Sequence, residues 1–262
     1  MSGRFEGKVA FVTGAGQGQG SCHIAALAAD GADIVAVDLQ DPEASESFAA
    51  AIQGARAAGR RVIARQCDVR DGARLTQIAD EAMAGFGRID IVLANAGILG
   101  PVGPFMELVP DEVQRTMDVN FLGVWNTCRA TVPHLIAGGR GGSIIITSSL
   151  FGLKGYANLA AYSASKHAVV GLMRSLAIEL GPHLIRVNSV HPTTVLTPML
   201  TDVTPVGPGH EDSVERLRGL HLLPIPWVES EDVTAAITFL ASDEARYMTG
   251  VALPLDGGAS VR

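Results

Sequence analysis

A tyrosine and a lysine stand four residues apart in the stretch "LAAYSASKHAVVG" (159–171), which is otherwise mostly small and apolar. Residues at positions i and i+4 lie on one face of a helix, so Tyr162 and Lys166 are expected to point the same way. A cation within about 4–6 Å of a phenol favours the phenolate and lowers its pKa from about 10. The pair could then supply a general base near neutral pH, although taken alone it also fits a tyrosine packed on a surface lysine.

A second candidate site is the glycine-rich turn "TGAGQGQG" at 13–20, between an expected strand and an expected helix. Gly14, Gly18 and Gly20 permit a tight turn and let backbone N–H groups approach a pyrophosphate at the start of the helix. Such a turn alone is a weak signal. It becomes a strong one because a strand precedes it, a helix follows it, and Asp38 ends the next expected strand.

Asp38 also indicates which nucleotide the turn would bind. A carboxylate there can accept hydrogen bonds from free ribose hydroxyls, but it would repel a 2′-phosphate. The nearby Gln17, Leu39 and Gln40 are neutral, so the sequence predicts NAD rather than NADP. Asp68, at the end of the third expected strand, could accept from the adenine amino group or cap the helix that follows, and both roles stay open.

Alternating strands and helices position these residues. Apolar, β-branched runs predict seven strands, at 8–14, 32–38, 61–69, 89–97, 142–149, 185–192 and 250–256. The segments between them predict helices at 18–30, 42–58, 71–85, 110–137, 158–180 and 230–245. Strands that are almost wholly apolar are buried on both faces, as in a parallel sheet covered by helices.

The pattern predicts a single doubly wound α/β domain over 1–262, a Rossmann-type fold with a seven-stranded parallel sheet and helices on both faces. Ligands bind at the carboxyl ends of such strands. Those ends are Gly14, Asp38, Asp68, Asn95, Ser149 and Pro192.

One segment breaks the alternation. Residues 200–229 contain four prolines and three glycines where a short connection would suffice. Connections of this length are usually functional or disordered, and this one leaves the carboxyl end of the sixth strand. We expect a substrate lid over the site, and a loose surface insertion is the alternative.

Composition excludes several classes of partner. A net charge of −7 argues against nucleic acid and anionic membranes, which attract basic patches. The three cysteines are scattered and the histidines dispersed, so neither a disulfide framework nor a metal site is predicted. No run approaches the roughly 20 apolar residues that span a bilayer, and no signal peptide is recognised, so a cytoplasmic protein is expected.

Taken together, the motifs have a family resemblance. Tyr162-x-x-x-Lys166, Ser149 thirteen residues upstream, Asn120 in "DVNFLGVW", "ANAG" at 94–97 and the glycine-rich turn resemble the short-chain dehydrogenase/reductase family. The resemblance covers essentially the whole chain. It implies hydride transfer between a nicotinamide cofactor and an alcohol or ketone.

The resemblance also implies roles for individual residues. Tyr162 would transfer the substrate proton, and Lys166 would bind the nicotinamide ribose and lower the pKa of the tyrosine. Ser149 would hydrogen-bond the substrate oxygen, and Asn120 would anchor a water linking Lys166 to solvent. The implied cofactor-binding residues are Gly14, Gln17, Gly18, Gln19, Gly20, Asp38, Leu39, Asp68, Val69, Asn95, Ala96, Gly97, Tyr162, Lys166, Pro192, Val195 and Thr197.

Two departures from the common family pattern indicate a branch. Gln19 replaces the usual Ile, and "HPTTV" replaces the usual Pro-Gly pair after the sixth strand. With "GLKGY" and "PIPWVESEDV", they resemble the actinobacterial carveol-dehydrogenase-like branch, many of whose members retain NAD and are associated with the redox carrier mycofactocin. This chain lacks the longer insertion those members often carry after the second strand, which argues against retention. His23 matches a branch position and is expected to pack the first helix.

The predicted function is an NAD-dependent dehydrogenase of secondary alcohols, with an alicyclic or terpenoid substrate. The apolar residues expected to line the pocket are Leu150, Phe151, Leu153, Met199, Leu200, Leu220, Leu222 and Trp227. A 3-oxoacyl-thioester reductase and a non-catalytic NAD-binding regulator are the alternatives; the first commonly uses NADPH and the second predicts an eroded site. The resemblance further implies a homotetramer with the helices at 110–137 and 158–180 between subunits.

Overall fold

The computed structural model describes residues 3–204, 206 and 209–262, and within them seven strands form one parallel sheet in the order β3-β2-β1-β4-β5-β6-β7. The strands are β1 (Val9–Thr13), β2 (Asp33–Asp38), β3 (Val62–Gln66), β4 (Ile91–Ala94), β5 (Gly142–Thr147), β6 (Ile185–Pro192) and β7 (Ala252–Leu255). The predicted fold class is confirmed. The chain order reverses between β1 and β4, and a crevice at such a reversal is where doubly wound sheets bind ligands.

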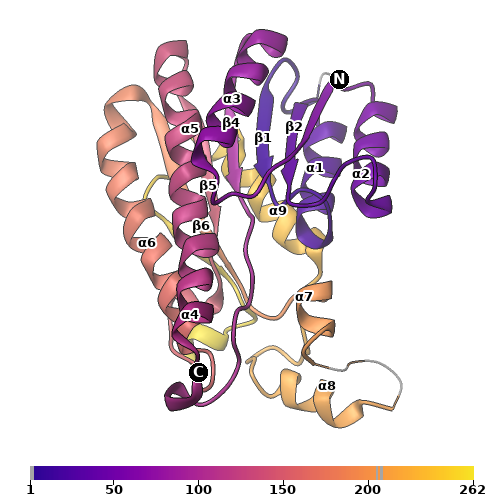
Figure 1. Cartoon of the computed structure of the whole chain (residues 1–262), viewed down its shortest axis with the longest axis vertical. Helices are drawn as coiled ribbons and strands as arrows, with labels where there is room; N and C mark the ends of the chain where they lie inside the picture. Colours follow the sequence, from indigo (N-terminus) through magenta and orange to yellow (C-terminus); the bar gives the residue numbers. More distant parts are fainter. Residues whose placement is uncertain (1–2, 205, 207–208) are drawn as a thin grey trace.

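Helices cover both faces of the sheet (Figure 1). They are α1 (Gly18–Ala29), α2 (Glu46–Ala57), α3 (Gly72–Phe86), α4 (Pro110–Met117), α5 (Gly123–Gly138), α6 (Ala160–Leu180), α7 (Pro198–Thr201), α8 (Glu211–Arg218) and α9 (Ser230–Ala241). One core joins the sheet to α3, α5 and α6, and the other joins it to α1, α2 and α9. Because both faces are covered, all five residues of β1 are buried, as the apolar runs predicted.

The expected continuous helix over 110–137 is wrong in one respect. A π-helical turn, Asp118–Leu122, separates α4 from α5. Such a turn accommodates an extra residue and is frequent at functional sites, and here it contains the buried Asn120. The residue types across this turn are still those of a helix, so the apolar pattern of the sequence does not reveal the interruption.

The segment after β6 extends from the carboxyl end of the sheet, with α7 and α8 below the main body in Figure 1. Its carboxyl-terminal end is held against the residues that follow β6. A parallel bridge joins Val195 to Val228, and the Val228 N–H donates to the Thr194 carbonyl oxygen (3.0 Å). Residues 205, 207 and 208 of the expected lid lie outside the described residues.

Candidate active site

The glycine-rich turn joins β1 to α1 with exposed helix N–H groups. Gly14 has a φ of +66°, and a Cβ there would lie 2.7 Å from the Ala96 Cα, so only glycine allows the two segments to approach. Gln17 is the N-cap of α1 and makes no side-chain capping bond within the described chain. The first amides of α1 are therefore available to an anion, as a pyrophosphate requires.

Asp38 is held rigidly at the end of β2. Its Oδ2 accepts from Gly16 N–H (2.7 Å) and its Oδ1 from Gln40 N–H (2.9 Å), and the side chain is 8% exposed. A Cβ at Gly16 would lie 2.8 Å from the Asp38 Cγ, so a glycine is needed there, which the sequence reasoning did not single out. Each carboxylate oxygen keeps a lone pair for a further donor such as a ribose hydroxyl.

Asp68 faces the same cavity from beyond β3. Its carboxylate pairs with Arg70 (2.6 Å), whose hydrogen bonds keep the pKa of Asp68 below its usual value. The capping role left open for Asp68 belongs instead to Asp71, whose side chain accepts from Arg74 N–H (2.9 Å) at the start of α3. The adenine contact stays a prediction.

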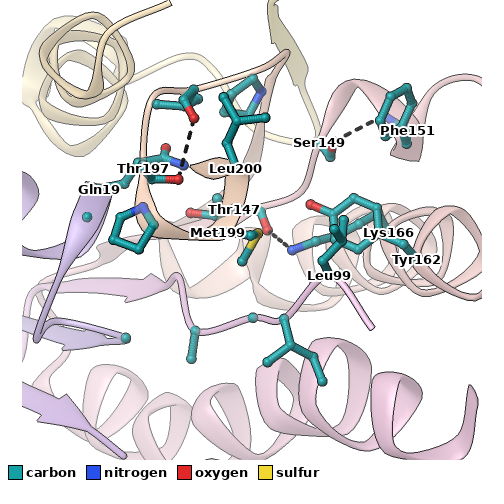
Figure 2. A pocket seen from close by; sticks show the side chains of 18 of the residues that line it. Gln19, Leu99, Thr147, Ser149, Phe151, Tyr162, Lys166, Thr197, Met199 and Leu200 are labelled. Atoms are coloured by element: carbon teal, nitrogen blue, oxygen red, sulfur yellow. Dashed lines mark hydrogen bonds between the residues drawn. The ribbon is translucent and has the colours of Figure 1, made fainter. Parts of the chain in front are cut away.

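Gln19 lies near α7 on the cavity wall (Figure 2). Its Oε1 is buried and has no hydrogen-bond partner among the described residues. Thr197, the N-cap of α7, lies 3.5 Å from where a Cβ of Gly18 would stand, so α7 closes on the glycine-rich turn. The unpaired acceptor and the uncapped helix are the features expected of a cradle for a dinucleotide.

Tyr162 and Lys166 lie on one side of α6, as expected from their spacing (Figure 2). The Lys166 Nζ is 5.7 Å from the centroid of the Tyr162 ring. The same ammonium donates to the backbone carbonyl of Thr147 (2.8 Å), which fixes it at the end of β5. The tyrosine is therefore not packed on a surface lysine, because Tyr162 and Lys166 are 8% and 4% exposed.

Burial dominates the electrostatics of this pair. It lowers the pKa of Lys166 to about 8. It also raises the pKa of Tyr162, and a hydrogen-bonding contribution from Ser149 offsets part of that rise. The expected lowering of the Tyr162 pKa is wrong for this structure, because removing the phenolate from water outweighs the hydrogen bond from Ser149.

Ser149 follows β5 and presents its hydroxyl to the cavity. Its Oγ accepts a hydrogen bond from Phe151 N–H at 3.2 Å (Figure 2). With this acceptor position filled, the hydroxyl proton is available for donation to Tyr162 or to an oxygen bound in the cavity. Stabilising an alkoxide-like oxygen requires such a donor.

Asn120 sits behind the cavity rather than in its wall. Its Oδ1 accepts from Ile98 N–H (2.8 Å), and its Nδ2 donates to the Ile98 carbonyl (2.9 Å) and to Ser165 Oγ (3.0 Å). A Cβ on Gly97 would lie 3.3 Å from both Asn120 Oδ1 and Lys166 Nζ, so the three residues meet at one point. The side chain thus braces the region around Lys166, and the water that Asn120 was expected to anchor stays a prediction.

The predicted site residues converge on one cavity of about 780 Å³. With the exception of Asn120, every catalytic and cofactor-binding residue predicted from the sequence lines it. Of the expected apolar residues, Leu150, Phe151, Met199, Leu200 and Leu220 line the cavity. Leu153, Leu222 and Trp227 lie outside the lining; the Trp227 indole instead donates to Glu229 Oε1 (2.9 Å).

Sequence reasoning missed several residues of the site. The Thr147 carbonyl holds Lys166, and the buried Ser148 hydroxyl donates to the Lys166 carbonyl (3.0 Å). Both directly precede Ser149, but a backbone acceptor and a buried hydroxyl leave no spacing signal. Tyr156 and Arg216 also line the cavity, and their types alone did not distinguish them from surface residues.

The described residues contain no group of three or more His, Cys, Asp or Glu side chains that could hold a metal ion. Within the same ranges, no helix has the length and apolarity required to cross a membrane.

Comparison with known proteins places the chain in a family. A family model described as enoyl-(acyl carrier protein) reductase matches residues 14–260. A (-)-trans-carveol dehydrogenase of Rhodococcus erythropolis is 46% identical over 277 residues, covering 99% of this chain and 99% of that protein. The chain belongs to the short-chain dehydrogenase/reductase family, which confirms the predicted resemblance and its carveol-dehydrogenase-like branch.

Solved structures agree. The crystal structure of carveol dehydrogenase from Mycobacterium avium in complex with NAD has a TM-score of 0.94 at 42% identity, covering 99% of this chain and 100% of that one. A short chain dehydrogenase from Mycobacterium paratuberculosis bound to NAD has a TM-score of 0.90 at 42% identity, with coverage of 99% and 100%.

Proposed function

We propose that this chain is an NAD-dependent dehydrogenase that interconverts a secondary alcohol and its ketone, with Tyr162 as the acid and base. The observation that carries the proposal is the convergence of Tyr162, Ser149 and Lys166 on one cavity with the glycine-rich turn and Asp38. A nucleotide cradle, a proton-transfer group and a hydrogen-bond donor for the substrate oxygen are the parts that this reaction needs.

Each site residue has a separate role in this reaction. The hydroxyls of Tyr162 and Ser149 both face the position of the substrate oxygen. In alcohol oxidation Tyr162 takes the hydroxyl proton, and in ketone reduction it returns one, while Ser149 stabilises the negative charge on the oxygen. NAD, when bound, supplies the hydride acceptor or donor. Lys166 holds the nicotinamide ribose, and Asp38 accepts from the adenosine ribose hydroxyls.

The substrate is an alicyclic or terpenoid alcohol. An aromatic group lines the cavity beside the reacting tyrosine: the ring centroids of Phe151 and Tyr156 are 4.9 Å apart, and those of Phe151 and Tyr162 are 6.4 Å apart in an edge-on arrangement. Met199 and Leu200 face this group from the segment after β6 (Figure 2). A compact apolar ring fits between such surfaces, and two relatives are named carveol dehydrogenases.

Residues 200–229 act as the substrate lid. Six residues of this segment line the cavity: Leu200, Val203, Thr204, Arg216, Leu217 and Leu220. The Val195–Val228 bridge joins the carboxyl end of the segment to the residues that follow β6, which keeps the segment at the mouth of the site.

The two alternative functions are not favoured. The NADPH-dependent 3-oxoacyl-thioester reductase conflicts with the carboxylate of Asp38, which is fixed where a 2′-phosphate would lie. The non-catalytic regulator predicts a lost site residue, whereas Asn120, Ser149, Tyr162 and Lys166 are all present and mutually positioned.

We also infer a cytoplasmic homotetramer. Leu122 and Trp125 are 42% and 48% exposed beside and on α5, and Ile178 on α6 is 80% exposed. Apolar side chains on two neighbouring helices support packing between copies of the chain. The free thiols of Cys22, Cys67 and Cys128 support a reducing compartment. Sedimentation at micromolar concentration would test the assembly, and a monomer would contradict it.

One experiment tests the reaction and the carrier together. The purified protein is mixed with excess NAD and a panel of alicyclic and terpenoid secondary alcohols, and the absorbance of reduced nicotinamide is followed. Continuous growth supports an enzyme that exchanges its cofactor freely. A burst of about one equivalent supports retained NADH that a mycofactocin-type carrier reoxidises. No reduction with any alcohol, despite NAD binding, contradicts the proposal.

A further inference from the structure

The backbone of Ser149 is held by a side chain where the sheet ends. The last hydrogen bond between β5 and β6 runs from Ser148 N–H to the Val190 carbonyl (2.9 Å). The next carbonyl, that of Ser149, accepts from Gly152 N–H (2.9 Å) and lies 2.8 Å from the Nδ1 of His191. A histidine on β6 thus extends the attachment between the strands by one residue, to the one that carries the oxygen-binding hydroxyl.

The geometry determines the tautomer of His191. A carbonyl oxygen can only accept, so Nδ1 carries the proton. The other nitrogen, Nε2, lies 2.8 Å from Ser189 Oγ and accepts from that hydroxyl. Both Ser189 and His191 are 0% exposed. Burial lowers the pKa of His191 to about 4, so the ring keeps this neutral arrangement at neutral pH.

We propose that His191 is a positioning residue that acts through Ser149, holding its backbone so that the hydroxyl stays aimed at the substrate oxygen. The inference rests on the proposed function, in which Ser149 donates to that oxygen. Because Ser149 Oγ accepts from Phe151 N–H, a rotation of this backbone would carry the hydroxyl proton away from the substrate oxygen.

The first test is a set of three substitutions with turnover as the readout. His191→Leu is expected to lower kcat about 10- to 100-fold, since misplacement of about 1 Å costs up to about 10²-fold. The KM for the alcohol and the Kd for NAD are expected to stay within about twofold, because His191 touches neither. His191→Asn places an amide N–H near the position of Nδ1 and is expected to restore most of kcat, whereas His191→Gln reaches the position of Nε2 and is not.

A merely structural histidine would behave differently. It would lower stability and all kinetic constants together, and Asn and Gln would not differ. In a Ser149→Ala background the proposal expects no further loss of kcat from His191→Leu, because the group it positions is gone. Additive losses, or a folded His191→Leu with wild-type kcat, would overturn the proposal. If His191→Leu does not fold, equal kcat in the Asn and Gln variants overturns it.

A readout without turnover separates this inference from the proposed function. The amides of Phe151 and Gly152 both bond to Ser149, so their hydrogen exchange reports on its backbone. His191→Leu is expected to speed exchange at both amides, and His191→Asn to restore it. A protein that binds NAD but oxidises no alcohol would contradict the proposed function, and unchanged exchange in His191→Leu would overturn the role of His191.

Discussion

The wall that carries Tyr162 and the lid that faces it are built in opposite ways. In the wall, at the junction of β5 and α6, the side chains of Ser149, Tyr162 and Lys166 are less than a tenth exposed, and buried hydrogen bonds fix their surroundings. In the described part of the lid, α8 buries Leu217, and its ion pair between Arg218 and Glu215 is long (3.7 Å) and exposed.

This difference implies that the wall sets the rate of the reaction and that the lid selects the substrate. A group in the wall cannot move without breaking buried bonds, so substitutions there are expected to change kcat or stability. An exposed ion pair contributes little, and α8 has one buried residue, so substitutions in the lid are expected to change which alcohol binds.

The largest expected effect is the loss of the proton-transfer group. Tyr162→Phe keeps the ring but removes the hydroxyl, and kcat is expected to fall by about 10³- to 10⁴-fold, at the upper end of general acid–base contributions. NAD binding, followed by quenching of protein fluorescence, is expected to be unchanged. The matched control is Tyr247→Phe, since Tyr247 is 88% exposed and outside the cavity. Full activity in Tyr162→Phe would contradict the mechanism.

A second prediction measures the cost of burying a cation in the wall. The pKa of Lys166 is about 8 in the fold against a usual 10.5, so between these values the unfolded chain binds more protons. Stability therefore rises with pH across this window. In a Tyr162→Phe background, which removes the opposing titration of the phenol, urea unfolding should show a rise from pH 7.5 to 10.5 that Lys166→Met lacks. The difference should be about 2–3 kcal/mol.

The control for this rise is Lys8→Met. Lys8 lies at the partly exposed end of the sheet, paired with Asp243 at 3.0 Å, and the rise should persist in that variant. Parallel pH curves for the parent and for Lys166→Met would mean that the wall does not hold the lysine in a dehydrated state.

The wall and the sheet were predictable from sequence for a physical reason. Buried strands, a glycine-rich turn and a Tyr–Lys pair on one helix face each require particular residue types at particular spacings. Asp38 could be placed because its function and its position at a strand end coincide. The order of the motifs then predicted which side chains meet at the carboxyl edge.

Other features leave no such signature. The π turn at Asp118–Leu122 does not disturb a helical apolar pattern, and the carbonyl of Thr147 accepts whatever its side chain is. Whether the pKa of Tyr162 is raised or lowered depends on how completely the ring is buried, and the packing of the fold determines that burial. In the lid the irregular backbone gives no period, so the sequence did not separate Leu220, in the cavity, from Leu222 outside it.

Asp38 lies between the two extremes, since its carboxylate is buried like the wall but its remaining acceptor sites face a ligand. Asp38→Ala is expected to weaken NAD binding about 10- to 100-fold, as for lost hydrogen bonds to a charged group. Binding of NADP should improve because the repulsion of its 2′-phosphate disappears. Titration calorimetry measures both, with the exposed Asp41→Ala as control. A variant that gains nothing with NADP would contradict the account of this end of the cavity.

The smallest expected effect comes from the lid. Leu220 lines the cavity, whereas Leu223 is 57% exposed and outside the lining, so the two leucines form a matched pair. Leu220→Ala is expected to raise the KM of a bulky alicyclic alcohol about 3- to 10-fold, equivalent to about 1 kcal/mol of apolar contact, and to leave kcat within twofold. A small acyclic alcohol, which does not reach the lid, should show no change, and neither should Leu223→Ala with either substrate. These expectations follow if the wall alone positions the reacting atoms. A fall in kcat with unchanged KM in Leu220→Ala would mean that the lid also orients the alcohol for proton transfer. The division between a wall that sets the rate and a lid that selects the substrate would then not hold.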